Sequence, residues 1–329
     1  MKYCFIINPH AGKGKFVAEL EQDIIFACDK AEKSYDIFIS NSIDDTKKYI
    51  EDASSDSDEG IVFFACGGDG TLCETILSVM SLDEEKRKNV CVGIVPKGTG
   101  NDFVSNFENK ELFCNIEAQI AGETHDIDLL KCNELYSVNM INIGFDCHVV
   151  CKKEEIGKKK FVPRKLAYIF SLIITLIKKP TVSLKRCDDG NESDKKTLLL
   201  TTLANGGFCG GGFYSNPKAS LFDGKIDCIE ANNMSRRKFV SLVGDYKSGK
   251  HLCEKFNGII ENFKTESTDL YFDEETPVSV DGEIIRTKEL HIRVARRALS
   301  VLIPRGVKPK VLAEVDDDAF DSVGHARTV

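Results

Sequence analysis

The sequence predicts an α/β domain built on a parallel sheet, followed by a mainly antiparallel domain of the β-sandwich type. Over roughly the first 105 residues, apolar runs of strand length alternate with segments of helical spacing, which is typical of parallel strands covered by helices. Two of these runs end in glycine-rich acidic loops. From about residue 130 to 290, short strand-like runs separated by turns are typical of an antiparallel sandwich.

Hydrophobic spacing places the elements of the first part. Continuous apolar runs indicate buried parallel strands, and apolar residues recurring every three or four positions indicate helices. We expect strands at 3–7, 34–40, 61–65 and 90–95, with helices ending near Lys33 and covering 46–53 and 71–80.

The second part contains shorter runs bounded by turn residues. We expect strands at 135–143, 197–204, 225–229, 268–272 and 278–280, and two more within 289–303 on either side of Ala295-Arg296-Arg297.

Composition excludes some classes of protein. With 44 basic and 52 acidic residues the net charge is −8, whereas nucleic-acid binders depend on Lys and Arg to neutralise phosphates. We therefore expect no nucleic-acid partner. The thirteen cysteines include no CxxC pair, and no signal-peptide pattern opens the chain. These features favour a reducing, cytoplasmic location.

The loop Gly67-Gly68-Asp69-Gly70 joins an apolar strand to a helix. Ligands of open α/β sheets bind at the carboxyl ends of strands, where glycines allow backbone N–H groups to approach phosphate oxygens. Asp69 beside phosphates would be repulsive unless it held a cation, so Mg²⁺ is implied. The alternative is a plain glycine turn with Asp69 as helix N-cap.

A second loop of this kind, Gly98-Thr99-Gly100-Asn101-Asp102, follows the strand at 90–95. Thr99 offers a hydroxyl to a phosphate, and Asp102 is a second carboxylate for a metal. One such loop could be an ordinary turn. Two of them at the ends of two parallel strands favour a phosphate site.

A third loop, Asn8 to Gly14, contains Gly12 but does not match the Walker pattern. On its own, it fits a strand-to-helix turn as well as a nucleotide contact.

These motifs together give the chain a resemblance to the diacylglycerol-kinase-like lipid kinases, which also include the sphingosine kinases. The resemblance covers nearly the whole length, from Asn8-Pro9 through the GGDG and GTGND loops to Val280-Asp281-Gly282-Glu283. GGDG alone would be unspecific, because NAD kinases and phosphofructokinases share it.

The resemblance implies an ATP-dependent kinase that phosphorylates a lipid hydroxyl, with diacylglycerol as the first candidate substrate. It implies a nucleotide-binding domain over 1–128 and a lipid-substrate β-sandwich over 129–290. Strands at 291–310 would return to the first domain, and 311–329 would form an acidic, disordered tail.

The resemblance also assigns residues to roles. Asp69, Asp102 and Asp128 would form an acidic Mg²⁺ network, and Glu283 would be the general base. Residues lining ATP would be Asn8, Gly12, Ser40 (where the family usually has Thr), Gly67, Gly68, Asp69, Gly70, Thr71, Glu74 and Thr99.

A second, structural Mg²⁺ is implied in the segment 216–225. Asp223 would bind it through its carboxylate, and Ser220 and Lys225 through backbone carbonyls. From the residues alone, Asp223-Gly224 and Asp281-Gly282 are also ordinary turn dipeptides, and Glu283 could be a solvated strand-edge acid.

Three alternatives stay open. A sphingoid-base kinase shares most of these motifs, although the sequence GTGND, with Asp102 present, favours the diacylglycerol type. An NAD kinase shares GGDG but should lack the other loops. A nucleotide-binding regulatory protein should have lost Asp69 or Glu283, and both are present.

The segment 161–179 is a candidate for peripheral membrane contact. It holds an apolar stretch of twelve residues between basic flanks, too short for the ~18 residues of a membrane span. The simpler interpretation is a partly buried helix with solvated ends. The more specific interpretation is an amphipathic segment that lies at the inner face of the membrane. The sequence does not indicate the oligomeric state.

Overall fold

The computed structural model describes residues 1–55, 60–145, 147–149, 151, 178 and 180–311. Nearly all of the segment 161–179 and of the tail 311–329 therefore lies outside the described residues. The chain forms two compact units. The first comprises Met1–Leu129, Leu221–Asp223 and the chain from Arg296 onward, and the second comprises Leu130–Ser220 and Gly224–Ala295.

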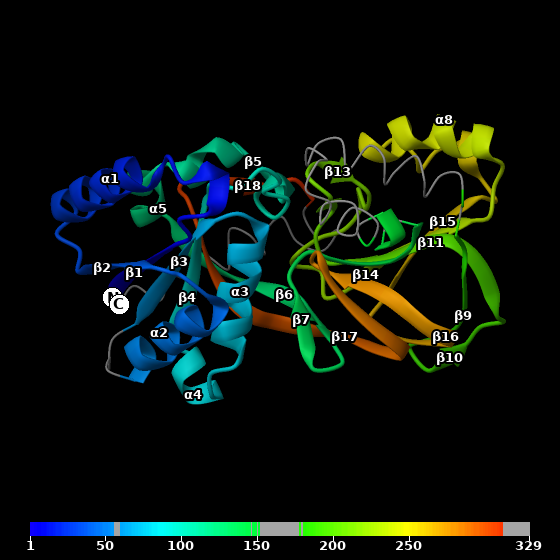
Figure 1. The fold of residues 1–329 in the computed structure, drawn as a ribbon, viewed down its shortest axis with the longest axis horizontal. Helices are drawn as coiled ribbons and strands as arrows, with labels where there is room; N and C mark the ends of the chain where they lie inside the picture. Colours follow the sequence, from blue (N-terminus) through cyan, green and yellow to red (C-terminus); the bar gives the residue numbers. More distant parts are fainter. Residues whose placement is uncertain (56–59, 146, 150, 152–177, 179, 312–329) are drawn as a thin grey trace, which may run out of the picture. The chain divides into compact units, whose positions relative to one another are not determined.

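The first unit contains a parallel sheet in the order β2-β1-β3-β4, and Val301 of β17 pairs in parallel with Val92 of β4. Figure 1 shows α1 and α5 on one side of these strands and α2 and α3 on the other. Its elements are β1 (Lys2–Ile7), η1 (Ala11–Lys13), α1 (Val17–Lys30), β2 (Tyr35–Ile39), α2 (Ile43–Ser55), β3 (Ile61–Gly67), α3 (Asp69–Met80), α4 (Glu84–Arg87), β4 (Val90–Pro96), η2 (Val104–Asn106), β5 (Phe107–Glu108), η3 (Lys110–Cys114), α5 (Ile116–Ile120) and β18 (Lys308–Pro309).

Alternation along β3 explains why this sheet is covered on both faces. Phe64 stacks on Phe5 with ring centroids 4.4 Å apart and packs with Leu20 of α1. Phe63, the preceding residue, points the other way and meets the ring of Tyr49 on α2 at 6.3 Å. All seven residues of β3 are buried, so the continuous apolar run is the signature of a doubly covered strand.

The second unit is an antiparallel β-sandwich with an apolar core that includes Leu184, Leu203, Leu270 and Leu290. The predicted α/β plus β-sandwich fold class is confirmed. Strands β6 (Glu123–Cys132) and β17 (Glu283–Ile303) contribute residues to both units. The other elements are β7 (Leu135–Ser137), β8 (Met140–Gly144), β9 (Val182–Asp188), β10 (Asn191–Glu192), β11 (Lys196–Ala204), β12 (Phe208–Cys209), β13 (Phe213–Tyr214), β14 (Ile226–Asn232), α8 (Arg236–Lys247), η4 (Glu254–Phe256), β15 (Ile260–Thr265) and β16 (Ser267–Val280).

Several predicted strands of the second unit have different bounds. The runs 268–272 and 278–280 belong to one strand, β16, whose pairing with β17 shifts register between Tyr271 and Thr276. The run 135–143 instead divides into β7 and β8. The two strands expected within 289–303 are one strand, β17, in which Arg297 adopts a φ of 49°.

The helix α8 was not predicted. Ser235 caps it by accepting a hydrogen bond from the backbone N–H of Lys238. Phe239, Leu242 and Tyr246 then occupy one helical face and are buried. No helix among the described residues has the length and apolar character needed to cross a membrane.

Candidate active site

Three loops of the first unit meet at the carboxyl edge of its parallel sheet. Ile7 pairs with Cys66, and Gly67 pairs with Pro96, so β1, β3 and β4 end side by side. The three motifs singled out in the sequence stand where these strands end, and Gly67 to Gly70, expected as a loop, instead ends β3 at Gly67 and begins α3 at Asp69. In open α/β sheets this edge is where ligands bind.

The carboxylate of Asp69 links two of these loops. Its Oδ2 accepts a hydrogen bond from the backbone N–H of Asn101 at 2.7 Å, and its Oδ1 accepts one from the backbone N–H of Asp102 at 2.6 Å. Hydrogen bonds to a charged group contribute about 1.5–3 kcal/mol each. Asp69 therefore holds the second glycine loop against the start of α3.

Glycine is required where these loops approach each other. A Cβ added to Gly98 would lie 2.4 Å from the Cα of Gly68, a distance that real Cβ atoms do not reach. Gly12 has a φ of 52°, and a Cβ there would lie 2.6 Å from the carbonyl oxygen of Lys97. The backbones of all three loops are thus in close contact, with no side chain between them at these points.

The predicted nucleotide residues fall into two groups. Some side chains already bond to protein. Asn8 donates through Nδ2 to Oγ1 of Thr71 at 3.0 Å, and the hydroxyl of Ser40 lies 2.7 Å from Oγ1 of Thr46. By contrast, Gly70 and Thr99 are exposed. Glu74 is partly exposed on α3.

The three predicted network acids have different surroundings. The backbone of Asp102 bonds to Asp69, so the loops bring these two residues together. Asp128 is buried, and its Oδ1 accepts a hydrogen bond from the backbone N–H of Arg297 at 2.8 Å. Within the part of the chain that the structure describes, no three His, Cys, Asp or Glu side chains are gathered as a metal site.

Glu283 lies in the second unit, where it is exposed and begins β17 directly after the turn Asp281-Gly282. Residues of the predicted structural Mg²⁺ loop are divided between the units: Asp223 belongs to the first, and Ser220 and Lys225 belong to the second. The side chain of Lys225 pairs with Glu266 at 2.7 Å.

Sequence reasoning missed the contribution of Asn101. Its side chain accepts a hydrogen bond from the N–H of Gly98 and donates one to the carbonyl of Gly98, both at 3.1 Å. Its φ is 55°. An Asn between Gly100 and Asp102 is the available signal, because Asn tolerates left-handed backbone and bonds to nearby main chain.

A cysteine, Cys66, lies near the end of β3. Burial raises the pKa of the Cys66 thiol, directly before Gly67. A neutral thiol is a poor nucleophile, so Cys66 is not a candidate nucleophile.

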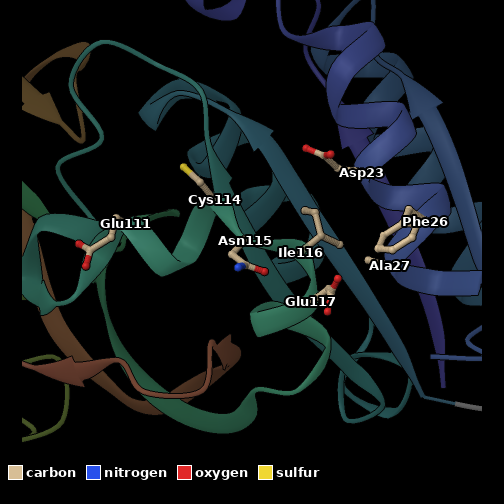
Figure 2. Close-up of a pocket in the computed structure, with 8 residues that line it drawn as sticks. All are labelled: Asp23, Phe26, Ala27, Glu111, Cys114, Asn115, Ile116 and Glu117. Atoms are coloured by element: carbon tan, nitrogen blue, oxygen red, sulfur yellow. The ribbon is translucent and has the colours of Figure 1, made fainter. Parts of the chain in front are cut away.

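A separate hollow of about 370 Å³ lies beside α1 and α5 (Figure 2). It contains none of the residues predicted for the site. Its lining residues are Asp23, Phe26, Ala27, Glu111, Cys114, Asn115, Ile116 and Glu117.

Comparison with known families agrees with this arrangement. Residues 2–132 match the diacylglycerol kinase catalytic domain, and residues 139–303 match the YegS C-terminal NAD kinase beta sandwich-like domain. The chain belongs to the diacylglycerol-kinase-like family of lipid kinases. It is accordingly an enzyme that transfers a phosphoryl group to an alcohol group of a lipid.

Two proteins with sequences similar to this lipid kinase align with most of its chain. A protein provisionally named a lipid kinase in Staphylococcus carnosus is 25% identical over 89% of this chain and 93% of its own. A protein with the same provisional name in Staphylococcus aureus is 29% identical over 78% of this chain and 79% of its own.

Solved structures share the fold. A diacylglycerol kinase from Bacillus anthracis superposes with a TM-score of 0.69 at 20% identity, covering 92% of this chain and 97% of that one. An NAD kinase from Archaeoglobus fulgidus in complex with ATP reaches 0.50 at 10% identity, covering 93% and 94%. Both likenesses concern the fold of the lipid kinase.

Proposed function

We propose that this lipid kinase transfers the γ-phosphoryl group of ATP to the free hydroxyl of diacylglycerol, giving phosphatidic acid. The observation that carries the proposal is the pair of hydrogen bonds from Asn101 and Asp102 to the carboxylate of Asp69. They hold two glycine loops together beside the start of a helix, as a phosphate site requires.

The start of α3 suits the phosphates of ATP. Its N-cap is Gly68, and no side chain among the described residues caps the helix there. The first N–H groups of a helix lack intrahelical partners and lie at the positive end of the helix dipole, so they favour anions. Asn8, Gly12, Ser40, Glu74 and Thr99 would complete the ATP-binding set, as the family resemblance implies.

The carboxylate of Asp69 suits Mg²⁺, which prefers carboxylate oxygens and water and is commonly held by one or two carboxylates together with substrate phosphates. Each oxygen of Asp69 accepts one hydrogen bond and keeps a further lone pair. The family resemblance implies Asp102 and Asp128 as the other carboxylates of the network, although no three such side chains are gathered in the described part of the chain. When bound, Mg²⁺ would neutralise charge on the transferring phosphoryl group. In the second site, Asp223 and the carbonyls of Ser220 and Lys225 would hold a structural ion.

Glu283 would act as the general base. A lipid alcohol is a weak nucleophile until its proton leaves, and a carboxylate that accepts this proton lowers the barrier. Its exposure at the start of β17 keeps its oxygens open to a substrate.

A phosphotransfer assay with γ-labelled ATP tests the acceptor. Diacylglycerol, a sphingoid base and NAD are supplied in turn, with ATP hydrolysis measured in parallel. We expect labelled phosphatidic acid and a much smaller yield from the other two. A preference for the sphingoid base would replace the proposed substrate but keep the kinase, whereas label in none of them would count against ATP as the donor.

We also propose contact with an anionic membrane surface at the cytoplasmic face. The basic flanks of the apolar stretch in 161–179 carry this idea, and apart from Lys178 they lie outside the described residues. Each Lys near an anionic surface contributes about 1 kcal/mol. Binding to vesicles containing phosphatidylserine should weaken with salt and with the triple change of Lys158, Lys159 and Lys160 to Glu. Equal sedimentation of the variant and the parent would refute the contact.

A further inference from the structure

The carboxylate of Asp281 is held by four donors from the connection between β7 and β8. Oδ1 accepts hydrogen bonds from Oγ of Ser137 at 2.9 Å and from the backbone N–H groups of Asn139 at 3.1 Å and Met140 at 2.8 Å. Oδ2 accepts one from the N–H of Val138 at 2.7 Å. One side chain thus satisfies three consecutive backbone donors of another loop.

Asp281 also forms the turn that precedes Glu283. Asp281 and Gly282 have φ values of 46° and 98°, and Val280 pairs with Glu283 across them. This is a two-residue hairpin turn with left-handed central residues, which Asn-Gly or Gly-Gly would form equally well. The turn itself therefore does not require a carboxylate, and the four hydrogen bonds need another explanation.

A general base must be held within about 0.5 Å of its working position. A hairpin turn gives little support to the residue that follows it, because it is bonded only to its own two strands. The Asp281 bonds attach this turn to the β7–β8 connection, and the N–H of Asp281 adds a further bond to the carbonyl of Met140 at 3.0 Å. The turn is thus attached to a third strand through both the side chain and the backbone of Asp281, two residues before Glu283.

We infer that Asp281 is a positioning residue for the kinase reaction, which holds the hairpin turn so that Glu283 meets the lipid hydroxyl in a fixed orientation. The inference rests on the proposed role of Glu283 as general base. Asp281 itself need not touch the substrate, since its carboxylate is occupied by the β7–β8 connection.

The same unit contains a matched control. Asp189 and Gly190 form another turn with φ values of 47° and 83°, between Asp188 and Asn191 of β9 and β10. The carboxylate of Asp189 accepts hydrogen bonds from the backbone N–H groups of Glu266 at 3.1 Å and Ser267 at 2.9 Å. The local architecture is alike, but Asn191 stands at the position that corresponds to Glu283.

The experiment compares Asp281→Asn, Asp189→Asn, Glu283→Gln and the double variant Asp281→Asn/Glu283→Gln in the full-length enzyme. Each Asn keeps the turn but replaces one acceptor oxygen by an amide. We expect both Asn variants to lose thermal stability. Of the two single Asn variants, only Asp281→Asn should lose kcat, by about 10- to 100-fold, since a misplacement of 1 Å can cost that much, with the KM for ATP nearly unchanged.

The double variant separates positioning from a direct role. If Asp281 acts through Glu283, the double variant should be no slower than Glu283→Gln alone. A further loss in the double variant would overturn the inference. The inference would also be overturned if Asp281→Asn and Asp189→Asn had the same kcat. That result would not affect the role of Glu283 as general base. A fully active Glu283→Gln enzyme would remove the base and the inference with it.

Ser137→Ala is a second, milder variant that tests the same inference if Asp281→Asn does not fold. It deletes one donor to Asp281 and leaves the turn sequence intact. We expect a severalfold lower kcat with an unchanged KM for ATP. Wild-type kcat in a folded Ser137→Ala enzyme would count against positioning.

Discussion

Asp69 Oδ1 accepts a hydrogen bond of 2.6 Å from the backbone N–H of Asp102, while its Oδ2 bonds to the N–H of the preceding residue. Two residues that lie 33 positions apart thereby fix the distance between the two glycine loops. The arrangement uses both oxygens of one carboxyl group as acceptors, and the single amide oxygen of asparagine could not replace both. Asp69 thus has a structural role in the site in addition to its proposed role toward Mg²⁺.

Adding a side chain where the two glycine loops are in contact should weaken ATP binding. In Gly98→Ala the added methyl group would collide with the Cα of Gly68, and overpacking of this kind costs about 1–3 kcal/mol. If that cost is expressed in ATP binding, affinity should fall by about 5- to 150-fold, because 1.4 kcal/mol corresponds to a factor of ten. Calorimetric titration with ATP measures the change.

Gly244→Ala is the control for that substitution. An added Cβ at Gly244, within α8, meets no atom within 4 Å. Its ATP affinity should equal that of the wild type, and its stability should rise by up to about 1 kcal/mol, because alanine favours a helix. If Gly98→Ala bound ATP as tightly as Gly244→Ala, the close contact of the loops would be irrelevant to the nucleotide.

Glu283→Gln should separate catalysis from nucleotide binding. Glutamine keeps the shape of the side chain but cannot accept the lipid proton, and general base catalysis contributes about 10²–10⁴-fold. We expect kcat to fall by that factor, with ATP affinity unchanged because the substitution alters none of the residues proposed to bind ATP. Steady-state kinetics in mixed micelles gives kcat, and a variant with wild-type kcat would show that the base lies elsewhere.

His251 should make the second unit sensitive to acid. The ring is fully buried, 4.8 Å from the ring of Tyr246, and burial lowers its pKa from 6.5 to about 4. The unfolded chain then binds a proton below pH 6.5 that the folded chain does not bind. Stability is therefore fully present above pH 6.5 and decreases as the pH falls toward 4, by about 3 kcal/mol in total.

His251→Phe is the variant for this prediction. Denaturant unfolding at pH 7, 6, 5 and 4 should show a shallower loss of stability in the variant than in the wild type, because phenylalanine does not titrate. Parallel pH profiles of the two proteins would show that His251 is not the cause.

The parallel sheet could be predicted because each of its strands leaves a local signal. The run 61–65 is apolar without interruption, and the structure buries all of β3. Strands of the second unit were harder to delimit. Asp273, Glu274 and Glu275 have the composition of a turn, yet they lie within β16, where the register shifts. The polar residues of α8 likewise concealed the spacing of Phe239, Leu242 and Tyr246.

The site was predictable in composition but not in its hydrogen bonds. The glycine loops are visible as motifs, because both their residue types and their places after strands are local features. The bonds of Asp69 to Asn101 and Asp102, and of Asp281 to the 137–140 connection, join segments distant in sequence. They depend on how strands are ordered in a sheet, which no single motif reveals.

The most direct test is the rate of label transfer from γ-labelled ATP to diacylglycerol by the wild type and Asp69→Asn. Asparagine lacks one acceptor oxygen and the charge, so the loops should separate and metal binding should weaken. Asp83→Asn is the control, because Asp83 caps α4 by accepting a hydrogen bond from the N–H of Lys86 at 3.0 Å. We expect labelled phosphatidic acid from the wild type and Asp83→Asn, and a rate lower by at least about 10²-fold for Asp69→Asn. A folded Asp69→Asn enzyme that transfers label at the wild-type rate would contradict the proposed phosphate site.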